Sequence, residues 1–336
     1  MANRRRIIMD AVKAAVSLHT EFGIKDELCS NPGRVHVFDL LDRNNIPCLF
    51  QPLDGLLGAY INSPYPGVLI STKRPKLSIQ RFTAAHELGH AVLEHQSSLD
   101  NEAVIARSPF DCNLSGDEQE IAANVFAVEL LMPKWLIVAH MKKQSWQSSD
   151  FNNPSVVYQL SLRMGVSYSA TCHTLLKYKA ISADKHHALI NTKPKSIKEK
   201  LSGKYVPENW RGDFWYLTEQ DTGLSVHASI EDTLIVSLSE SASSGYQWFL
   251  ENADQNVDIV EDWRETFSSN SIGGVINRKL AIKPKKCGYI SIEFNEYRPW
   301  LTDADPIESV ELGCMISDPE RRGLSDMMRA NSLAAA

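Results

Sequence analysis

The chain has 336 residues, of which 43% are hydrophobic and 23% are charged, and its formal net charge is −6. This composition is ordinary for a globular protein and excludes a low-complexity or disordered chain. No apolar run approaches the roughly 20 residues that span a bilayer, and Asp10 and Lys13 interrupt the first apolar stretch, so we expect neither a membrane segment nor export.

The first part of the chain predicts an α+β unit, with a small sheet followed by helices. Short apolar runs bounded by turn residues indicate the strands, and periodic apolar residues indicate the helices. The expected elements are helices over 5–21 and 34–43, strands over 46–50, 57–61 and 67–71, a helix over about 77–95, a polar loop over 96–116 and a helix over about 117–131.

The helix near residue 80 contains the sequence His86-Glu87-Leu88-Gly89-His90. Residues four apart share one helix face, so both imidazoles can reach the same ion. This is the pattern of zinc peptidases, in which the intervening Glu acts on the attacking water. The alternative is a helix that carries two histidines by chance.

Apolar residues recur along the same helix at spacings of three and four. They are Ile79, Phe82, Ala85, Gly89 and Val92. This spacing predicts an apolar stripe that faces the core, and Gly89 leaves room for another segment to approach closely.

A catalytic zinc site needs a third protein ligand. The three-histidine class requires Gly and His where this chain has Leu93 and Gln96, so that class is excluded. A carboxylate is then needed, and the residues alone leave several open. The candidates are Glu94, Glu102, Asp111, Asp117, Glu118, Glu120 and Glu129. Of these, Glu120 has Asn124 one helical turn further on the same face, where an amide can hydrogen-bond a ligand.

A resemblance selects among these candidates. The sequence RFTAAHELGH at 81–90 and the sequence EIAANVFAVELLMP at 120–133 resemble the ImmA/IrrE family of metallo-endopeptidases. The hallmark of that family is a HELGH helix followed by E-x-x-A-N-x-F-A-x-x-L-L-M-P. The resemblance covers about residues 5–185 and implies a zincin-like metallopeptidase domain.

The resemblance also implies roles for individual residues. His86, His90 and Glu120 would hold one Zn²⁺ per chain, and Glu87 would be the catalytic base, with Asn124 as support. Members of the family cleave helix-turn-helix repressors. The resemblance therefore implies an endopeptidase that acts on a DNA-binding repressor in mobile-element, stress or phage-defence regulation.

Residues 155–163 and 167–178, joined by a turn at 164–166, predict a helix-turn-helix outline. The second helix has no Arg or Lys over 167–176, and base readout prefers those residues. We therefore expect a helical subdomain packed on the protease and no direct binding of nucleic acid. The lysine-rich stretch 177–204 predicts a linker or an exposed helix.

From about residue 205 the chain changes in charge and in periodicity. Residues 1–204 carry 24 Lys and Arg against 19 Asp and Glu, a net of +5, whereas residues 205–318 carry 8 against 20, a net of −12. The contrast indicates separate domains. Short β-branched and aromatic runs predict an all-β, immunoglobulin-like sandwich. Its strands are expected at 224–228, 233–238, 246–250, 280–282 and 289–294.

Three loop segments of this part, at 243–248, 272–274 and 297–300, resemble the binding loops of chagasin-type cysteine-peptidase inhibitors. The resemblance covers about residues 220–316. The partner-binding residues that it implies are Gly245, Tyr246, Trp248, Gly273, Gly274, Arg298, Pro299 and Trp300. The family's Asn-Pro before the first loop is replaced by Ser241-Ala242, which disfavours inhibition of a cysteine peptidase. We expect another protein partner, which the negative charge predicts to be basic.

The sequence thus predicts five segments: a zincin-like metallopeptidase domain at 1–135, a helical subdomain at 136–190, a basic linker at 191–210, a chagasin-like β-sandwich at 211–318 and a mobile tail at 319–336. The leading hypothesis is a zinc endopeptidase that cleaves a repressor. The alternative is a protein-binding or inhibitory module, such as a toxin–antitoxin partner, in which the β domain is the main functional part. Six scattered cysteines are typical of reduced thiols and predict a cytoplasmic protein.

Overall fold

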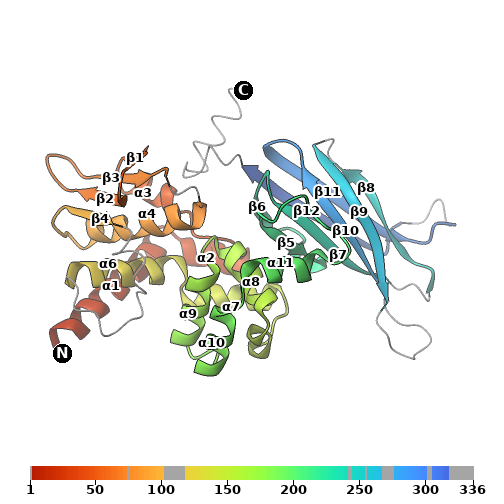
Figure 1. The fold of residues 1–336 in the computed structure, drawn as a ribbon, viewed down its shortest axis with the longest axis horizontal. Coiled ribbons are helices and arrows are strands. Elements are labelled where there is room, and N and C mark those ends of the chain that lie inside the picture. Colours follow the sequence, from red (N-terminus) through yellow and green to blue (C-terminus); the bar gives the residue numbers. More distant parts are fainter. Residues whose placement is uncertain are drawn as a thin grey trace.

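The computed structural model describes residues 2–73, 76–101, 118–240, 244–253, 256–266, 276–300 and 305–317. The described chain forms an N-terminal α/β part, a central group of helices and a C-terminal β part, arranged in a row (Figure 1). The expected mobile tail at 319–336 lies outside these residues.

The N-terminal part contains one four-stranded sheet. Its strands are β1 (Cys48–Gln51), β2 (Leu56–Ile61), β3 (Gly67–Ser71) and β4 (Ser98–Asn101), in the order β1-β3-β2-β4. β1 runs parallel to β3, and β2 runs antiparallel to both β3 and β4. We expected a polar loop where strand β4 lies, because its sequence Ser-Leu-Asp-Asn has only one apolar residue. The strand forms through backbone pairing with β2.

In the described residues of this part, six helices pack on the sheet or extend from it. They are α1 (Ala2–Glu21), α2 (Ile24–Ser30), α3 (Val37–Arg43), α4 (Leu77–Val92), α6 (Glu118–Leu131) and α7 (Lys134–Lys143). Helix α4 packs on β2 and β3, and α6 lies between α1 and α4. Residues Glu118–Lys143 together are long and apolar enough to cross a membrane, but 67% of their most apolar window is buried in the protein, as in the core helix of a folded domain.

The buried surface of helix α4 extends beyond the apolar stripe that the sequence predicts. Ile79 and Phe82 are only partly buried, whereas Gln80 and Arg81 are buried. The polar side chains are buried because other elements cover that side of the helix: Arg81 donates through Nε to the carbonyl of Gly165, at 3.0 Å, and through Nη2 to the carbonyl of Val35. The pattern of hydrophobic residues alone does not show such a contact.

The central helices include the expected helix-turn-helix outline. They are α8 (Pro154–Met164), α9 (Tyr168–Lys177), α10 (Ala183–Ile190) and α11 (Pro194–Ser202). Gly165, in the left-handed region at φ 65°, ends α8. The segment 191–210, expected to be a basic linker within a stretch predicted as a linker or an exposed helix, contains α11. That helix buries Ile197 and Leu201, so it belongs to the packed structure.

The C-terminal part consists of two four-stranded sheets, in the orders β5-β7-β10-β9 and β6-β12-β11-β8. The strands are β5 (Phe214–Leu217), β6 (Ser225–Ser229), β7 (Thr233–Glu240), β8 (Gln247–Ala253), β9 (Val257–Thr266), β10 (Ile276–Pro284), β11 (Gly288–Tyr297) and β12 (Glu308–Ser317). Apolar residues from both sheets form one core, in which Trp248 and Phe294 are fully buried.

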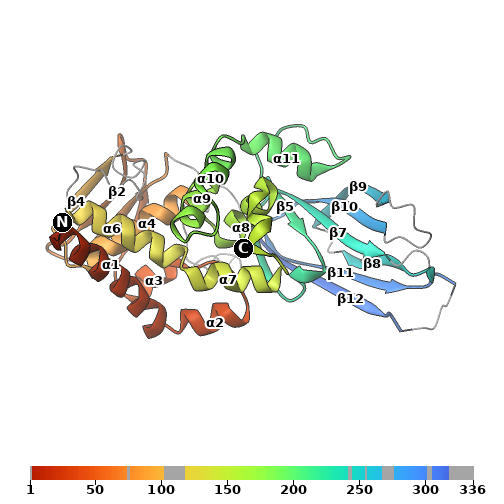
Figure 2. The same ribbon diagram turned by 90° about the horizontal axis from the view of Figure 1, so that it is seen from below.

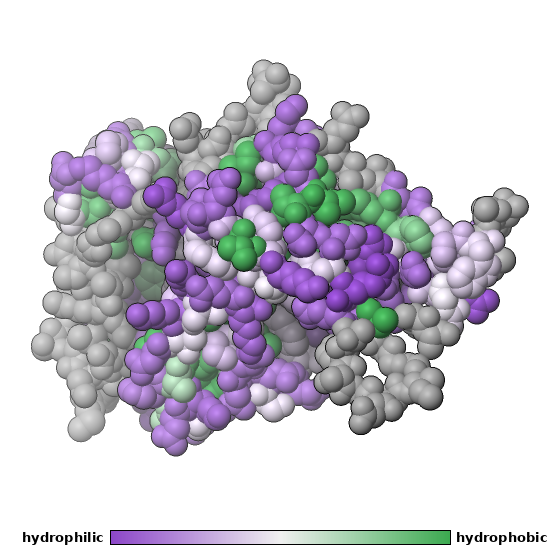
Figure 3. All heavy atoms as spheres, turned by 45° about the vertical axis from the view of Figure 1, so that its right-hand side comes forward, coloured by the Kyte–Doolittle hydropathy of each residue, from purple (hydrophilic) through white to green (hydrophobic). Residues whose placement is uncertain are grey.

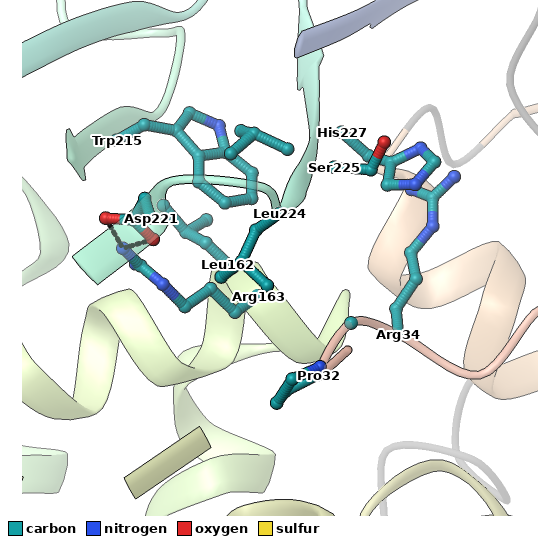
Figure 4. A pocket seen from close by; sticks show the side chains of 11 residues that line it. Pro32, Arg34, Leu162, Arg163, Trp215, Asp221, Leu224, Ser225 and His227 are labelled. Atoms are coloured by element: carbon teal, nitrogen blue, oxygen red, sulfur yellow. Dashed lines mark hydrogen bonds and ion pairs between the residues drawn. The ribbon is translucent and has the colours of Figure 1, made fainter. Parts of the chain in front are cut away.

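Helix α8 lies beside β5 of the β part (Figure 2), and polar contacts join the two (Figure 4). Arg163 on α8 donates from Nη2 to both carboxylate oxygens of Asp221, at 2.9 and 3.0 Å, and to the carbonyl of Tyr216, at 2.9 Å. Gln159, one turn earlier, donates to the carbonyl of Phe214 and accepts from the amide of Tyr216. The cavity beside this junction measures about 20 Å³, which is room for a water molecule and not for a larger ligand.

In the coloured part of the face seen in Figure 3, hydrophilic residues predominate and apolar residues form patches among them. Isolated exposed apolar side chains are normal on protein surfaces.

Candidate metal centre

The two helices of the candidate site approach each other closely at Gly89. A Cβ atom at this position would lie 2.9 Å from Cδ1 of Phe126 and 3.3 Å from Cα of Ala123, both on α6. Only glycine leaves this space without a shift of α6. The close approach expected from the sequence brings the His86–His90 turn of α4 beside the first turn of α6.

Three donor groups converge between these helices. Nε2 of His86 lies 3.0 Å from Nε2 of His90, and the Glu120 carboxylate lies 3.3 Å from the first and 3.4 Å from the second. Both histidines are fully buried, and the Glu120 side chain is 20% exposed. Among the described residues, this is the group of His, Cys, Asp and Glu side chains that can hold a metal ion.

Asn124 lies beside His86, as the helix spacing predicts. Its Oδ1 is 3.1 Å from Nδ1 of His86. An amide oxygen only accepts, so Nδ1 donates and the lone pair of His86 is left on Nε2, which faces the cluster.

Glu87 is fully buried and packs against the sheet. A Cβ atom on Gly58 of β2 would lie 2.6 Å from Oε1 of Glu87. Tyr60 lies two residues after Gly58 on the same face of β2. Its ring stacks on the His90 ring, with the ring centroids 6.4 Å apart. Burial raises the pKa of Tyr60, with a further contribution from Glu94, so its phenol is neutral.

Cys48 on β1 is a partly buried thiol whose pKa is affected by the Glu87 carboxylate. Burial raises the pKa of Cys48 to about 12, and the carboxylates of Asp42 and Glu87 add to the shift. The group is therefore a neutral thiol, which is a poor metal ligand compared with a thiolate.

The other carboxylates considered from the sequence do not join the cluster. Glu129 is bound by Lys177 and by the Tyr178 hydroxyl, which donates to it at 3.1 Å. Glu94 and Glu118 are exposed. Glu102, Asp111 and Asp117 lie outside the described residues.

His95 also lies at the site, although its sequence position indicates either an oxyanion donor or, more simply, a helix-end residue with no catalytic role. Nδ1 of His95 lies 3.0 Å from Nδ1 of His90. From the sequence His95 is a residue at the end of a helix, and no spacing rule connects positions five apart on one helix. Its position depends on how the chain turns after α4.

The expected partner-binding residues of the β part divide into two groups. Arg298 donates to the carbonyl of Ser244, at 2.9 Å, and its guanidinium lies 4.6 Å from the centre of the Tyr246 ring. The Trp300 ring covers Gly245 so closely that a Cβ there would overlap it, and Trp300 is 63% exposed. These loops therefore meet at one edge, to which the exposed Pro299 also belongs.

Trp248 is a correction to the expected set. It is fully buried in the β core, and its indole N–H donates to the carbonyl of Ser239 at 2.9 Å. It alternates with outward-facing residues along β8 and points inward. Gly273 and Gly274 lie outside the described residues.

Comparisons with known proteins agree with this arrangement. Residues 55–176 match the family model described as the IrrE N-terminal-like domain, and residues 227–313 match the chagasin family of peptidase inhibitors. Each match covers one part of the chain and shows what that part is similar to. The first match includes His86, Glu87, His90 and Glu120, so it supports a metallopeptidase.

A curated protein and several solved structures are similar to about a third of the chain. Amoebiasin-2 of Entamoeba histolytica is 28% identical over 102 residues, which is 30% of this chain and 83% of that protein. The crystal structure of the cysteine protease inhibitor EhICP2 from Entamoeba histolytica covers 32% of this chain and all of its own, with 23% identity and a TM-score of 0.30. The structure of PbICP-C in complex with falcipain-2 covers 33% of this chain and 96% of its own, with 16% identity and a TM-score of 0.23.

Proposed function

We propose that this protein is a zinc-dependent endopeptidase, with His86, His90 and Glu120 as the metal ligands and Glu87 as the general base. The convergence of three donor groups between α4 and α6 carries the proposal. We also propose that this part has a zincin-like fold and that the β part is an immunoglobulin-like sandwich.

The donor set fits zinc in chemistry and in spacing. Two imidazoles and one carboxylate are a common catalytic set, and they leave one position open. With bonds near 2.0–2.1 Å, two ligands of a tetrahedral zinc lie roughly 3.3 Å apart. The donor atoms here are separated by 3.0, 3.3 and 3.4 Å.

The roles of the other residues follow from their positions. Zinc at this cluster would supply Lewis-acid activation of the water and of the scissile carbonyl. Glu87 takes the proton of the attacking water and passes it to the leaving amine. Asn124 keeps the lone pair of His86 directed at the cluster.

The substrate class and the location follow from the resemblance and the composition. We propose a DNA-binding repressor as substrate, because members of the ImmA/IrrE family cleave such proteins. We propose a cytoplasmic location, with which the five described cysteines agree, because all of them are free thiols.

The test combines metal analysis with a trapping variant. The wild-type protein should bind about one zinc per chain. Glu87→Gln should keep the zinc and lose cleavage, so co-expression of this variant with the products of neighbouring genes should trap the substrate. Glu120→Gln should lose the zinc, whereas the matched change Glu129→Gln on the same helix should keep both zinc and cleavage. Cleavage by Glu87→Gln at the wild-type rate would refute the proposal.

A second candidate function rests on the loop edge of Gly245, Tyr246, Arg298 and Trp300. The contacts between these loops preorganise an exposed aromatic edge, and the chagasin-family match supports a protein partner there. One of the similar solved structures, EhICP2, is a cysteine protease inhibitor. We propose that this edge binds a protein in trans.

Inhibition assays separate the two functions. If the edge inhibits cysteine peptidases, a papain-type enzyme should be inhibited by wild type and by Glu87→Gln alike, and Trp300→Ala should abolish the effect. If biological activity survives in Glu87→Gln and is lost in Trp300→Ala, the binding module is the main function.

A further inference from the structure

The ligand helix α4 ends in a tight turn directly after His90. Glu94 adopts the left-handed conformation at φ 55°, its amide donates to the carbonyl of Ala91 at 3.2 Å, and the amide of His95 donates to the carbonyl of His90 at 2.9 Å. These two bonds form a Schellman motif, which reverses the chain at the end of a helix. The reversal places His95 next to His90, the second candidate ligand on α4.

The loop that holds His95 is also tied to the sheet. Asn62 directly follows β2. Its side-chain Nδ2 donates to the carbonyl of His95 at 3.4 Å, and its backbone N–H donates to the Ser97 hydroxyl at 3.1 Å. The Ser97 hydroxyl in turn donates to Oδ1 of Asn62 at 2.8 Å. The backbone of His95 is therefore held by both the helix and the strand.

The His95 ring lies on the far side of His90 from the metal cluster. The two rings are 5.0 Å apart at an angle of 70°, and their Nδ1 atoms are separated by 3.0 Å. Nε2 of His90, at the other side of the ring, faces His86 and Glu120. His95 is thus placed to act through His90 and not as a ligand itself.

The pairing fixes where the His90 proton lies. Two facing ring nitrogens form a hydrogen bond only when one donates and the other accepts. A metal ligand at Nε2 carries its proton on Nδ1, so His90 donates and His95 accepts. Asn124 has the same role toward Nδ1 of His86, at 3.1 Å.

We propose that His95 is a positioning residue of the metal centre, which accepts the Nδ1 proton of His90 and keeps the lone pair of Nε2 directed at the metal. The proposal rests on the proposed function in that it takes His90 as a ligand. Each histidine ligand then has an acceptor for its Nδ1 proton: Asn124 of α6 for His86, and His95 of the turn after α4 for His90.

The experiment measures zinc affinity of the full chain by competition with a chelator, without any substrate. His95→Phe removes the acceptor while keeping a ring, and zinc affinity should fall by about 10- to 100-fold, as for lost outer partners of metal ligands. His95→Asn places a carbonyl oxygen where Nδ1 lies, so it should recover most of the affinity. The exposed His187→Phe on α10 is the control and should bind zinc as wild type does.

Two results would overturn the proposal: wild-type affinity in His95→Phe, or an affinity in His95→Asn as low as in His95→Phe. Thermal unfolding of the metal-free proteins checks that both variants fold. The visible absorption of the cobalt-loaded proteins reports the ligand geometry directly, and His95→Phe should change it. Zinc binding in wild type and its loss in Glu120→Gln test the proposed function separately, and a wild-type chain that binds no zinc would end both proposals.

Discussion

Gly58 on β2 lies directly against the Glu87 carboxylate on α4. A Cβ atom at Gly58 would lie 2.6 Å from Oε1 of Glu87 and would collide with Cγ2 of Thr83. The absence of a side chain at this position therefore sets how closely the sheet approaches the proposed general base. A substitution at Gly58 can therefore shift the Glu87 side chain while residue 87 remains a glutamate.

Gly58→Ala should lower kcat while leaving zinc affinity close to that of wild type. Displacement of a catalytic group by about 1 Å can cost about 100-fold in rate, and the added methyl group should also destabilise the fold by about 1–3 kcal/mol. The measurement is cleavage of the substrate trapped by Glu87→Gln, with zinc binding in parallel. Gly67→Ala on β3 is the control, because its nearest neighbour would be the Pro47 carbonyl at 3.8 Å. Equal rates for the two variants would contradict this reasoning.

The Arg163–Asp221 pair should couple the unfolding of the central helices to that of the β part. Both side chains are nearly inaccessible, so Asp221→Ala leaves a buried charge without its carboxylate and should cost about 3–5 kcal/mol. Denaturation followed by near-ultraviolet dichroism gives the change in the free energy of unfolding. Glu199→Ala breaks the exposed pair with Lys195 and should change stability by less than about 1 kcal/mol.

His140 should make the protein less stable in mild acid. Burial lowers the pKa of His140 to about 4, partly opposed by its contact with the Gly33 carbonyl at 2.9 Å. Because the folded pKa lies below the ordinary value of 6.5, the stabilising contribution is present above about pH 6.5 and is lost as pH falls toward 4. The loss from His140 between pH 7 and 5 should be about 2 kcal/mol.

His140→Gln isolates this contribution, because Gln can donate to Gly33 and does not titrate. Asp232 changes in the opposite sense, since burial raises its pKa to about 6 and its contribution is lost as pH rises through that value. Asp232 is common to both proteins, so the difference between their pH profiles belongs to His140. Parallel profiles from pH 7 to 5 would show that His140 is not the cause.

Trp248 and Trp300 should respond to substitution in opposite ways. Trp248→Ala removes a fully buried side chain and should destabilise the protein by about 3–5 kcal/mol. Trp300→Ala should change stability by about 0.5 kcal/mol or less but weaken partner binding by about 30-fold, as expected of an exposed aromatic anchor. Unfolding and a binding titration with a papain-type cysteine peptidase give the two values. A stable Trp248→Ala protein would contradict the assignment of this residue to the core.

The sequence predicted the elements whose pattern is local. The strands β1 to β3 and the helices α4 and α6 follow from apolar periodicity and turn residues, and the clustering of His86, His90 and Glu120 is consistent with the family motif. The α/β and β-rich parts follow from the change in periodicity near residue 205.

The features that the sequence did not predict depend on contacts between distant segments. Strand β4 has little apolar patterning and pairs through its backbone with β2. His95 reaches His90 only because Glu94 reverses the chain. Trp248 belongs to a loop motif, but strand alternation at β8 decides which way it points.

Helix α8 has a further consequence for how such a chain can arise. One side of it, with Val157 and Leu160, belongs to the N-terminal core, whereas Tyr158 packs with Phe214 of β5. The boundary between the two parts therefore runs along a single helix and does not fall at a point in the chain. Recombination that replaced the β part with a homologous module would leave Tyr158, Gln159 and Arg163 facing a foreign strand. The two parts are consequently expected to be inherited and to diverge together, and chimaeras that keep α8 should succeed only with a β5 from the same lineage.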